Sequence, residues 1–265
     1  MRTRLLAIDI DGTLLTRDRV PHPDNIVAVR RATEAGIRVV LASGRVAASM
    51  REFSDQLGLD GAMICSNGGH VQGLGGVELL HLGLAEEAVD ITLKYADRLG
   101  IHVNAYTRNE IFFLSDSSWG EMYRRRVQSV QPKLSSSAEV RQMDVLKLIL
   151  IDEPLKIPIH RAALEKLLSN HIASLTESEP EYLEVLSPAA NKGFGLKVLS
   201  ESLGIRQEET AAIGDYLNDL EMVTWAGIGA AVENAHEDVK EAADIVVPSN
   251  NDGGVARFIE YLLDR

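Results

Sequence analysis

The stretch Asp9-Ile10-Asp11-Gly12-Thr13-Leu14 follows the apolar run that starts at Leu5, and it decides the fold. The run predicts a buried strand, and two carboxylates spaced i, i+2 on a strand point to the same side. At the carboxyl end of a parallel strand they would face the crevice in which open α/β sheets bind ligands. Gly12 lets the chain leave the strand in a conformation that other residues resist. The alternative is a solvated acidic turn, but an unpaired charge at Asp9, between Ile8 and Ile10, would be costly.

Strands and helices alternate regularly near both ends of the chain, whereas the central segment lacks this alternation. This rhythm predicts parallel strands joined by right-handed crossovers. Near the start of the chain we expect a helix from Pro23 to the stop signal Gly36, strand Arg38–Ala42, helix Val46–Leu57 and strand Ala62–Cys65. After Asn191 we expect helix Gly195–Leu203, strand Thr210–Ile213, helix Leu217–Ala226, strand Ile228–Val232, helix Glu237–Ala243, strand Ile245–Val247 and a final helix.

The central segment mixes strands and helices without that alternation. Its expected elements are helix Ala85–Leu99, strands Val103–Tyr106, Ile111–Leu114 and Val145–Ile151, helix Arg161–Leu168 and strand Tyr182–Leu186. Consecutive strands without a helix between them favour an antiparallel sheet. The sequence therefore predicts an α/β fold with a Rossmann-like parallel-sheet core, built from residues 1–83 and 188–265, and an inserted α+β cap at residues 84–187.

Two further clusters suit phosphate. Ser43-Gly44-Arg45 follows the second expected strand and offers a hydroxyl, backbone amides at a helix start and a guanidinium. Ser-Gly is also an ordinary turn. Lys192 stands just before an expected helix, and a single lysine is more often a solvated surface residue.

Another cluster, Gly214-Asp215-Tyr216-Leu217-Asn218-Asp219, follows a strand and opens a helix. Asp215 and Asp219 are four apart, which places them on neighbouring turns of one helix face. Such oxygen-rich clusters suit Mg²⁺, although a capping Asp with an acidic first turn would look the same. Asn67-Gly68-Gly69 ends the third strand and is equally consistent with a simple turn. The coincidence of polar clusters at four strand ends favours a phosphate and magnesium site.

Composition limits the function classes. The 265 residues carry a net charge of -12, which disfavours nucleic acid and anionic lipid as partners. No apolar stretch reaches the roughly 20 residues of a membrane span, and the basic start is broken too early, at Asp9, for a signal peptide. Cys65 is the only cysteine and lies in an apolar run, which indicates a buried structural thiol and a reducing cytoplasm. The seven histidines show no spacing typical of zinc.

Together, these residues resemble the haloacid-dehalogenase (HAD) superfamily of phosphatases. The run from Asp9 to Thr13 is similar to its first motif, Ser43 to the second, Lys192 to the third, and Gly214 through Asp219 to the fourth. The inserted segment resembles the α+β cap of the Cof-like branch, as do Ser66–Gly69 and Asn250–Val255. The branch often has Gly-Asn-Ala after the fifth strand, whereas this chain has Glu233-Asn234-Ala235.

The resemblance implies a role for each matched residue. Asp9 is expected to be the nucleophile, and Asp11 the acid for the leaving alcohol and then the base for water. Mg²⁺ is expected on Asp9, the main-chain carbonyl of Asp11, and Asp215, with Asp219 in support. Phosphate or substrate contacts are expected from Gly12, Ser43, Gly44, Arg45, Lys192 and Asn218.

The predicted function is Mg²⁺-dependent hydrolysis of a small phosphorylated metabolite, with sugar phosphates favoured by the resemblance, through an aspartyl-phosphate intermediate. Asp11 argues against a dehalogenase, because halide leaves without a proton. Two alternatives stay open: a phosphomutase or phosphotransferase that uses the same intermediate, and a metabolite-binding regulator without catalysis. We expect a monomer or small homo-oligomer with the cap selecting the substrate.

Overall fold

The structure, a computed structural model, describes residues 2–127, 130–169 and 171–265. It divides into two compact units. The first contains the residues up to Gly44, Met50–Leu80 and Asn191–Arg265, and the second contains Arg45–Ser49 and His81–Ala190. The α/β fold class is confirmed, while the role of the second unit as a cap stays a prediction.

The first unit is built on one sheet of mainly parallel strands. Among the described residues its order is β14 (Ile245–Val247), β13 (Ile228–Val232), β12 (Thr210–Gly214), β1 (Leu5–Asp9), β2 (Arg38–Ala42), β3 (Met63–Cys65), β4 (His70–Gln72) and β5 (Glu78–His81). Neighbours from β14 to β3 pair in parallel, and β4 returns antiparallel to β3. The strand with the acidic motif, β1, therefore lies inside the sheet, between β12 and β2.

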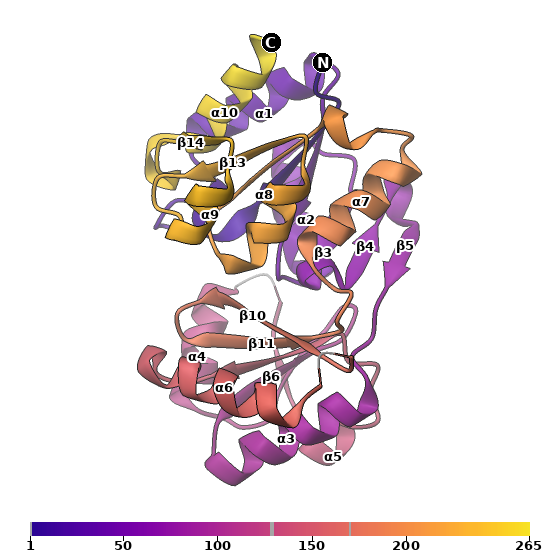
Figure 1. Cartoon of the computed structure of the whole chain (residues 1–265), viewed down its shortest axis with the longest axis vertical. Coiled ribbons are helices and arrows are strands. Elements are labelled where there is room, and N and C mark those ends of the chain that lie inside the picture. The colour runs from indigo at the N-terminus through magenta and orange to yellow at the C-terminus, as the bar shows by residue number, and fades with distance from the viewer. Residues whose placement is uncertain (1, 128–129, 170) are drawn as a thin grey trace. The chain divides into compact units, whose positions relative to one another are not determined.

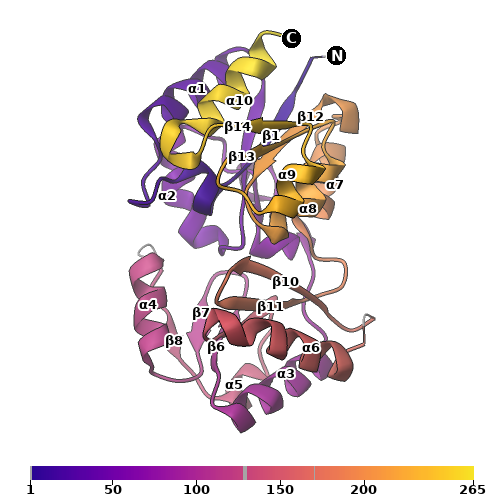
Figure 2. The same cartoon turned by 60° about the vertical axis from the view of Figure 1, so that its left-hand side comes forward.

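Helices cover both faces of this sheet. On one face α1 (Pro23–Glu34) packs beside α10 (Gly254–Leu263), and on the other lie α7 (Lys192–Ser202) and α8 (Leu220–Trp225) (Figures 1 and 2). Two further helices are α2 (Ala47–Leu57) and α9 (Glu237–Ala242). The α7 and α8 face buries Leu5, Val40, Leu196, Leu199 and Met222 in a common cluster. This packing removes apolar surface from water and fixes β1.

The second unit has a separate sheet and a separate core. Its order is β10 (Ser174–Glu179), β11 (Tyr182–Leu186), β9 (Lys147–Ile151), β6 (His102–Tyr106), β7 (Ile111–Phe113) and β8 (Lys133–Leu134). Pairing is antiparallel except between β7 and β8, as expected for an α+β unit. Helices α3 (Glu86–Leu99), α5 (Ser137–Val140) and α6 (Ile157–Leu167) share one apolar cluster with the sheet, whereas α4 (Ser118–Arg126) belongs to another.

Several predicted boundaries are wrong. Helix α7 begins at Lys192 rather than Gly195, because the Asn191 side chain caps it by accepting from the Phe194 N–H at 2.7 Å. Helix α6 begins at Ile157 rather than Arg161, since a proline is compatible with a first helical turn. The expected helix from Leu217 is a 3₁₀ turn followed by α8. Strand β10 and helix α4 were not predicted at all.

Two expectations from composition can be compared with the structure. Cys65 is buried at the end of β3, which agrees with a structural thiol. Within the described ranges, each helix is either too short or too polar to cross a membrane.

Candidate active site

The polar motifs of the first unit converge at one edge of its sheet. Asp9 is the last residue of β1 and pairs in register with Ala42 of β2, so Ser43 is the next residue beyond it. On the other side, Ile8 pairs with Ile213 of β12, so Gly214 and Asp215 emerge at the same edge. Parallel pairing thus brings together residues more than 200 positions apart in the sequence.

Lys192 forms ion pairs with two carboxylates, those of Asp9 and Asp219, and so connects a buried cluster of charged side chains. Its ammonium donates to Asp9 Oδ1 at 2.7 Å and to Asp219 Oδ1 at 2.5 Å, and its side chain is fully buried. Since an ammonium desolvated in this way is stable only beside opposite charge, these two bonds explain its burial. Burial alone would lower the pKa of Lys192, but the carboxylates of Asp219 and Asp9 outweigh it and raise that pKa.

In the fourth motif, Gly214 through Asp219, the last residue bonds the backbone near the start of the motif. The second oxygen of Asp219, Oδ2, accepts from the backbone N–H groups of Asp215 at 3.0 Å and Tyr216 at 3.3 Å. Both oxygens of Asp219 are therefore engaged. A side chain at Gly214 would place its Cβ 2.4 Å from Cβ of Asp219, which explains the glycine. The four-residue spacing thus reflects a capping turn, and the expectation that it marks one face of a helix is wrong.

Gly12 and Thr13 position Asp215. Gly12 has φ +84°, and a Cβ there would lie 2.2 Å from Asp215 Oδ2, so any other residue would be strained and would collide. Thr13 donates its hydroxyl proton to Asp215 Oδ1 at 3.1 Å. The turn after β1 is therefore shaped around the Asp215 carboxylate.

The site carries more negative than positive charge. Burial, together with the nearby charge of Asp219, raises the pKa of Asp9 to about 7, although Lys192 acts in the opposite direction. Burial and then the charges of Asp9 and Asp219 raise the pKa of Asp215 well above its usual range. One ammonium does not balance three carboxylates in a buried place.

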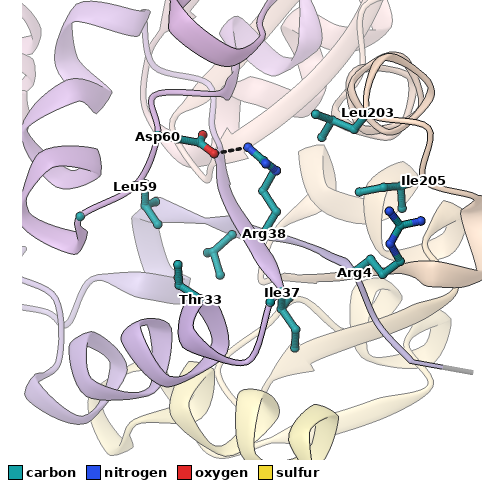
Figure 3. A pocket seen from close by; sticks show the side chains of 11 residues that line it. Arg4, Thr33, Ile37, Arg38, Leu59, Asp60, Leu203 and Ile205 are labelled. Atoms are coloured by element: carbon teal, nitrogen blue, oxygen red, sulfur yellow. Dashed lines mark hydrogen bonds and ion pairs between the residues drawn. The ribbon is translucent and has the colours of Figure 1, made fainter.

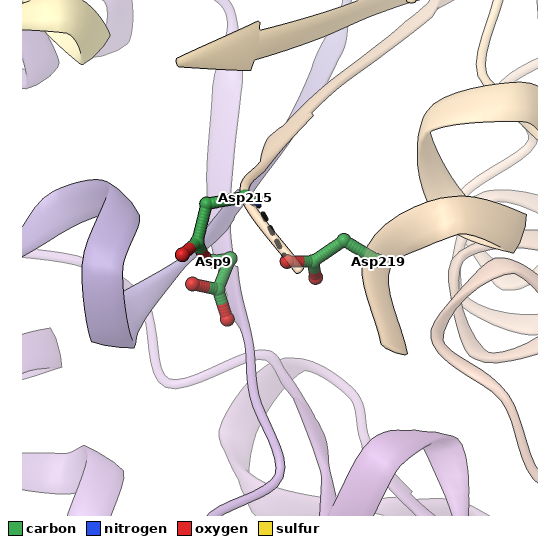
Figure 4. Close-up of side chains that lie close together, drawn as sticks. All are labelled: Asp9, Asp215 and Asp219. Carbon is green, nitrogen blue, oxygen red and sulfur yellow. Dashed lines mark hydrogen bonds between the residues drawn. The ribbon is translucent and has the colours of Figure 1, made fainter. Parts of the chain in front are cut away.

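This arrangement fits a divalent cation. Asp9, Asp215 and Asp219 each offer a carboxylate oxygen, and these oxygens lie within 4.8 Å of one another (Figure 4). The Oδ2 atom of Asp9 is buried and has no hydrogen-bond partner among the described residues. An orphaned carboxylate oxygen beside excess negative charge is the environment that a hard cation such as Mg²⁺ would satisfy. The acidic cluster could therefore bind a metal.

Asp11 differs from the expected geometry. Strand β1 ends at Asp9, and Asp11 lies in the turn that follows, so the prediction that both carboxylates project from one strand is wrong. Asp11 Oδ1 accepts from Arg19 at 3.0 Å, and its side chain is 30% exposed. Asp11 still contributes to the raised pKa of Asp9, so the two carboxylates influence each other.

The remaining predicted residues occupy different places. Ser43 is buried directly after β2, and its N–H donates to the Ile64 carbonyl at 2.9 Å. Asn218 is buried and donates to Asn67 Oδ1 at 3.1 Å. Gly44 belongs to the first unit, whereas Arg45 is buried and belongs to the second. Site roles for these residues therefore remain predictions.

Sequence reasoning missed several members of the network. Thr13 was part of the first motif but received no role. Asn234, in the tripeptide that departs from the family pattern, donates to the Gly12 carbonyl at 2.9 Å, and its side-chain oxygen accepts from Asn250 N–H at 2.9 Å. Two features of the sequence could have indicated these contacts. Glu233-Asn234-Ala235 keeps the Asn-Ala of the family's Gly-Asn-Ala, and Asn250–Val255 resembles the Cof-like branch. Arg19 gave no signal beyond its charge.

The opposite edge of the sheet has a cavity of a different kind. It measures about 330 Å³ and is lined at the amino ends of β1 and β2 by residues that include Arg4 and Arg38 (Figure 3). Both guanidinium groups have carboxylate partners, Glu209 at 3.5 Å from Arg4 and Asp60 beside Arg38. The positive charge of this cavity is thus largely balanced by Glu209 and Asp60. The acidic cluster lies at the opposite edge of the sheet, where the strands β1 and β12 end.

Comparison with known proteins agrees with this geometry. A family model described as haloacid dehalogenase-like hydrolase matches residues 6–259. The chain is 30% identical over 272 residues to a putative phosphatase of Streptococcus pyogenes, covering 98% of each chain. It is 30% identical over 264 residues to a 5-amino-6-(5-phospho-D-ribitylamino)uracil phosphatase of Bacillus subtilis, covering 97% of this chain and 95% of the relative. A crystal structure of a haloacid dehalogenase-like hydrolase from Bacteroides thetaiotaomicron matches with TM-score 0.84 and 28% identity, covering 98% of this chain and 100% of that chain.

The chain therefore belongs to the haloacid dehalogenase-like hydrolase family. Within that family it is a Cof-like phosphatase, a phosphoric monoester hydrolase, and the predicted resemblance is confirmed.

Proposed function

We propose that this phosphatase uses Mg²⁺ and an aspartyl-phosphate intermediate on Asp9 to hydrolyse a small phosphorylated metabolite, with a sugar phosphate favoured. The observation that carries the proposal is the state of the Asp9 carboxylate. Lys192 holds Oδ1 at 2.7 Å, while Oδ2 has no hydrogen-bond partner among the described residues. The carboxylate is oriented through one oxygen and keeps a second, uncommitted oxygen, so it can meet a cation and a phosphorus atom with different oxygens, which suits a positioned nucleophile.

In the first step an oxygen of Asp9 attacks phosphorus, and the bond from phosphorus to the leaving oxygen breaks. Asp11 donates a proton to that oxygen, so the leaving group departs as an alcohol. The Asp11 side chain is 30% exposed, so a small molecule has access to it. Lys192 and Ser43 would hold the phosphoryl oxygens, which gain charge as the reaction proceeds.

In the second step Asp11, now a carboxylate, takes a proton from water. The water oxygen attacks phosphorus, the bond from phosphorus to Asp9 breaks, and inorganic phosphate leaves. Asp9 returns to a carboxylate and Asp11 to its protonated form. The sum is one phosphate ester and one water converted to one alcohol and one phosphate.

The metal would be held by Asp9, the main-chain carbonyl of Asp11, and Asp215. Asp219 would support it indirectly, since its oxygens are engaged by Lys192 and by two backbone amides. When bound, Mg²⁺ would neutralise the repulsion between the carboxylates and a phosphate dianion. Thr13 and Gly12 keep Asp215 in place for this purpose.

A small substrate is favoured by two observations. The Bacillus subtilis relative is a phosphatase of a phosphoribitylamino-uracil, a small phosphorylated molecule. The net charge of -12 disfavours polyanionic substrates. We propose that residues 84–187 act as a cap that selects the substrate by contacting its leaving group. The motifs of the first unit supply side chains that would bind only phosphate, the metal and the reacting atoms.

The test is a turnover assay with p-nitrophenyl phosphate and a panel of sugar phosphates in Mg²⁺. Asp9→Asn, which is nearly isosteric but a poor nucleophile, should lower kcat at least about 10³-fold, as expected for loss of a nucleophile. Asp55→Asn, an exposed aspartate of α2, is the matched control and should keep the parent rate. A tenth of the parent rate in Asp9→Asn would rule out the covalent mechanism. Phosphate delivered to a second sugar rather than released would identify a mutase.

A further inference from the structure

The turn Ser66-Asn67-Gly68, which follows β3, has an unusual backbone. Three consecutive residues have positive φ, at +49°, +54° and +84°, and the first two are not glycine. Ser66 and Asn67 are also buried, and the Ser66 hydroxyl oxygen lacks a hydrogen-bond partner among the described residues. Such strain costs free energy and persists only where the surrounding contacts impose it.

The contacts that impose it come from three loops of the candidate active site. The Asn67 N–H donates to the Ser43 carbonyl at 3.0 Å, and the Asn218 side-chain amide donates to Asn67 Oδ1 at 3.1 Å. A Cβ at Gly68 would lie 2.1 Å from the carbonyl oxygen of Asn191, the capping residue directly before Lys192. The turn is therefore in contact with the loop after β2, the start of α7 and the loop after β12.

Asn67 is the part of the turn that bonds two of these loops at once. Its left-handed backbone aims the N–H at Ser43, and its side chain accepts from Asn218. With this backbone, Asn67 bonds both partners from one position. Asn also tolerates the left-handed region better than most residues.

We propose that Asn67 is a positioning residue for phosphate transfer, which acts by fixing Asn218 and the Ser43 loop relative to Lys192. This inference rests on the proposed function. Misplacement of binding groups by about 1 Å can cost about 10²-fold in rate, so loss of the Asn67 side chain should lower kcat by about that factor. KM should change much less, because Lys192 and Ser43 still provide the phosphate contacts.

Asn67→Gly is the informative variant, since glycine adopts the left-handed backbone and removes only the side chain. Asn67→Asp keeps an acceptor oxygen and should retain more kcat than Asn67→Gly. Asn25→Ala is the control for stability alone, because the Asn25 side chain is buried and bonds Leu14 and Ala256 through their backbones. It should lower the urea midpoint and leave kcat unchanged.

The decisive measurement is a double-mutant cycle of Asn67→Gly and Asn218→Ala, read as kcat and KM on one sugar phosphate. If Asn67 acts through Asn218, the double variant should lose no more than the worse single variant. Independent losses that multiply, or a kcat for Asn67→Gly within twofold of the parent, would overturn the inference. Absence of turnover by the parent protein would instead refute the proposed function.

Discussion

Replacing Lys192 with methionine tests whether the buried cluster depends on one ammonium. The change keeps side-chain length and removes two charge-assisted hydrogen bonds, at 2.7 Å to Asp9 and 2.5 Å to Asp219. Three carboxylates then remain in the site without the ammonium that bonds two of them. Breaking a buried pair in this way costs about 3–5 kcal/mol of unfolding free energy. At a urea m value of about 2 kcal/mol/M, the midpoint should fall by about 1.5–2.5 M in metal-free buffer.

The control is Lys197→Met on the same helix. Lys197 is half-exposed and lies 3.9 Å from Glu201, so its removal should cost less than about 1 kcal/mol. Urea unfolding of the three proteins, followed by circular dichroism with a chelator present, gives the comparison. Mg²⁺ should then narrow the difference in midpoint between Lys192→Met and the parent, because the site without its ammonium carries more net negative charge and should bind the cation more tightly. Turnover by Lys192→Met should stay low even so. A midpoint for Lys192→Met equal to that of Lys197→Met would refute the reasoning.

Three further outcomes are expected. Asp11→Asn should lower kcat/KM, which reports the step that releases the leaving group, about 10²–10⁴-fold for a sugar phosphate but far less for p-nitrophenyl phosphate, because nitrophenolate leaves without a proton; equal losses in kcat/KM on both substrates would remove Asp11 as the acid. Chelation should abolish turnover, and Mg²⁺ should restore it better than Ca²⁺, whose larger and looser shell suits this acidic cluster less well; full activity after exhaustive chelation would contradict this. Burial raises the pKa of the Cys65 thiol to about 12, so the thiol stays neutral until the pH approaches that value. It should therefore not react with Ellman's reagent in mildly alkaline buffer until the protein is unfolded. Rapid labelling of the folded protein would show that Cys65 is accessible.

The sequence was informative where local pattern and chemistry coincide. Asp9 could be placed at a strand end because an apolar run precedes it, and Asp215 because it follows the apolar strand Thr210–Gly214. Strands Arg38–Ala42 and Ile228–Val232 were predicted with the bounds they have in the structure. In each case the burial that produces the element is visible as a continuous run of apolar residues.

Features that depend on tertiary contacts could not be predicted. The helix start at Lys192 depends on the Asn191 cap, and the bond from Asn67 to Asn218 joins residues 151 positions apart. The left-handed backbone at Ser66 is imposed by its neighbours, since serine alone does not favour it. Strand β10 was missed because its sequence, Ser-Leu-Thr-Glu-Ser-Glu, is polar, as an edge strand can be.

The central claim is that Asp9 carries the phosphoryl group during turnover, and chemical trapping tests it most directly. The Asp11→Asn variant is suited to this, because loss of the base for water should slow breakdown of the intermediate. Mixed with p-nitrophenyl phosphate and Mg²⁺, quenched in acid and reduced with borohydride, it should yield homoserine at position 9 by peptide mass mapping. Asp9→Asn, treated identically, should yield none. Nitrophenol release by Asp11→Asn with an unmodified aspartate at position 9 throughout the time course would contradict the account.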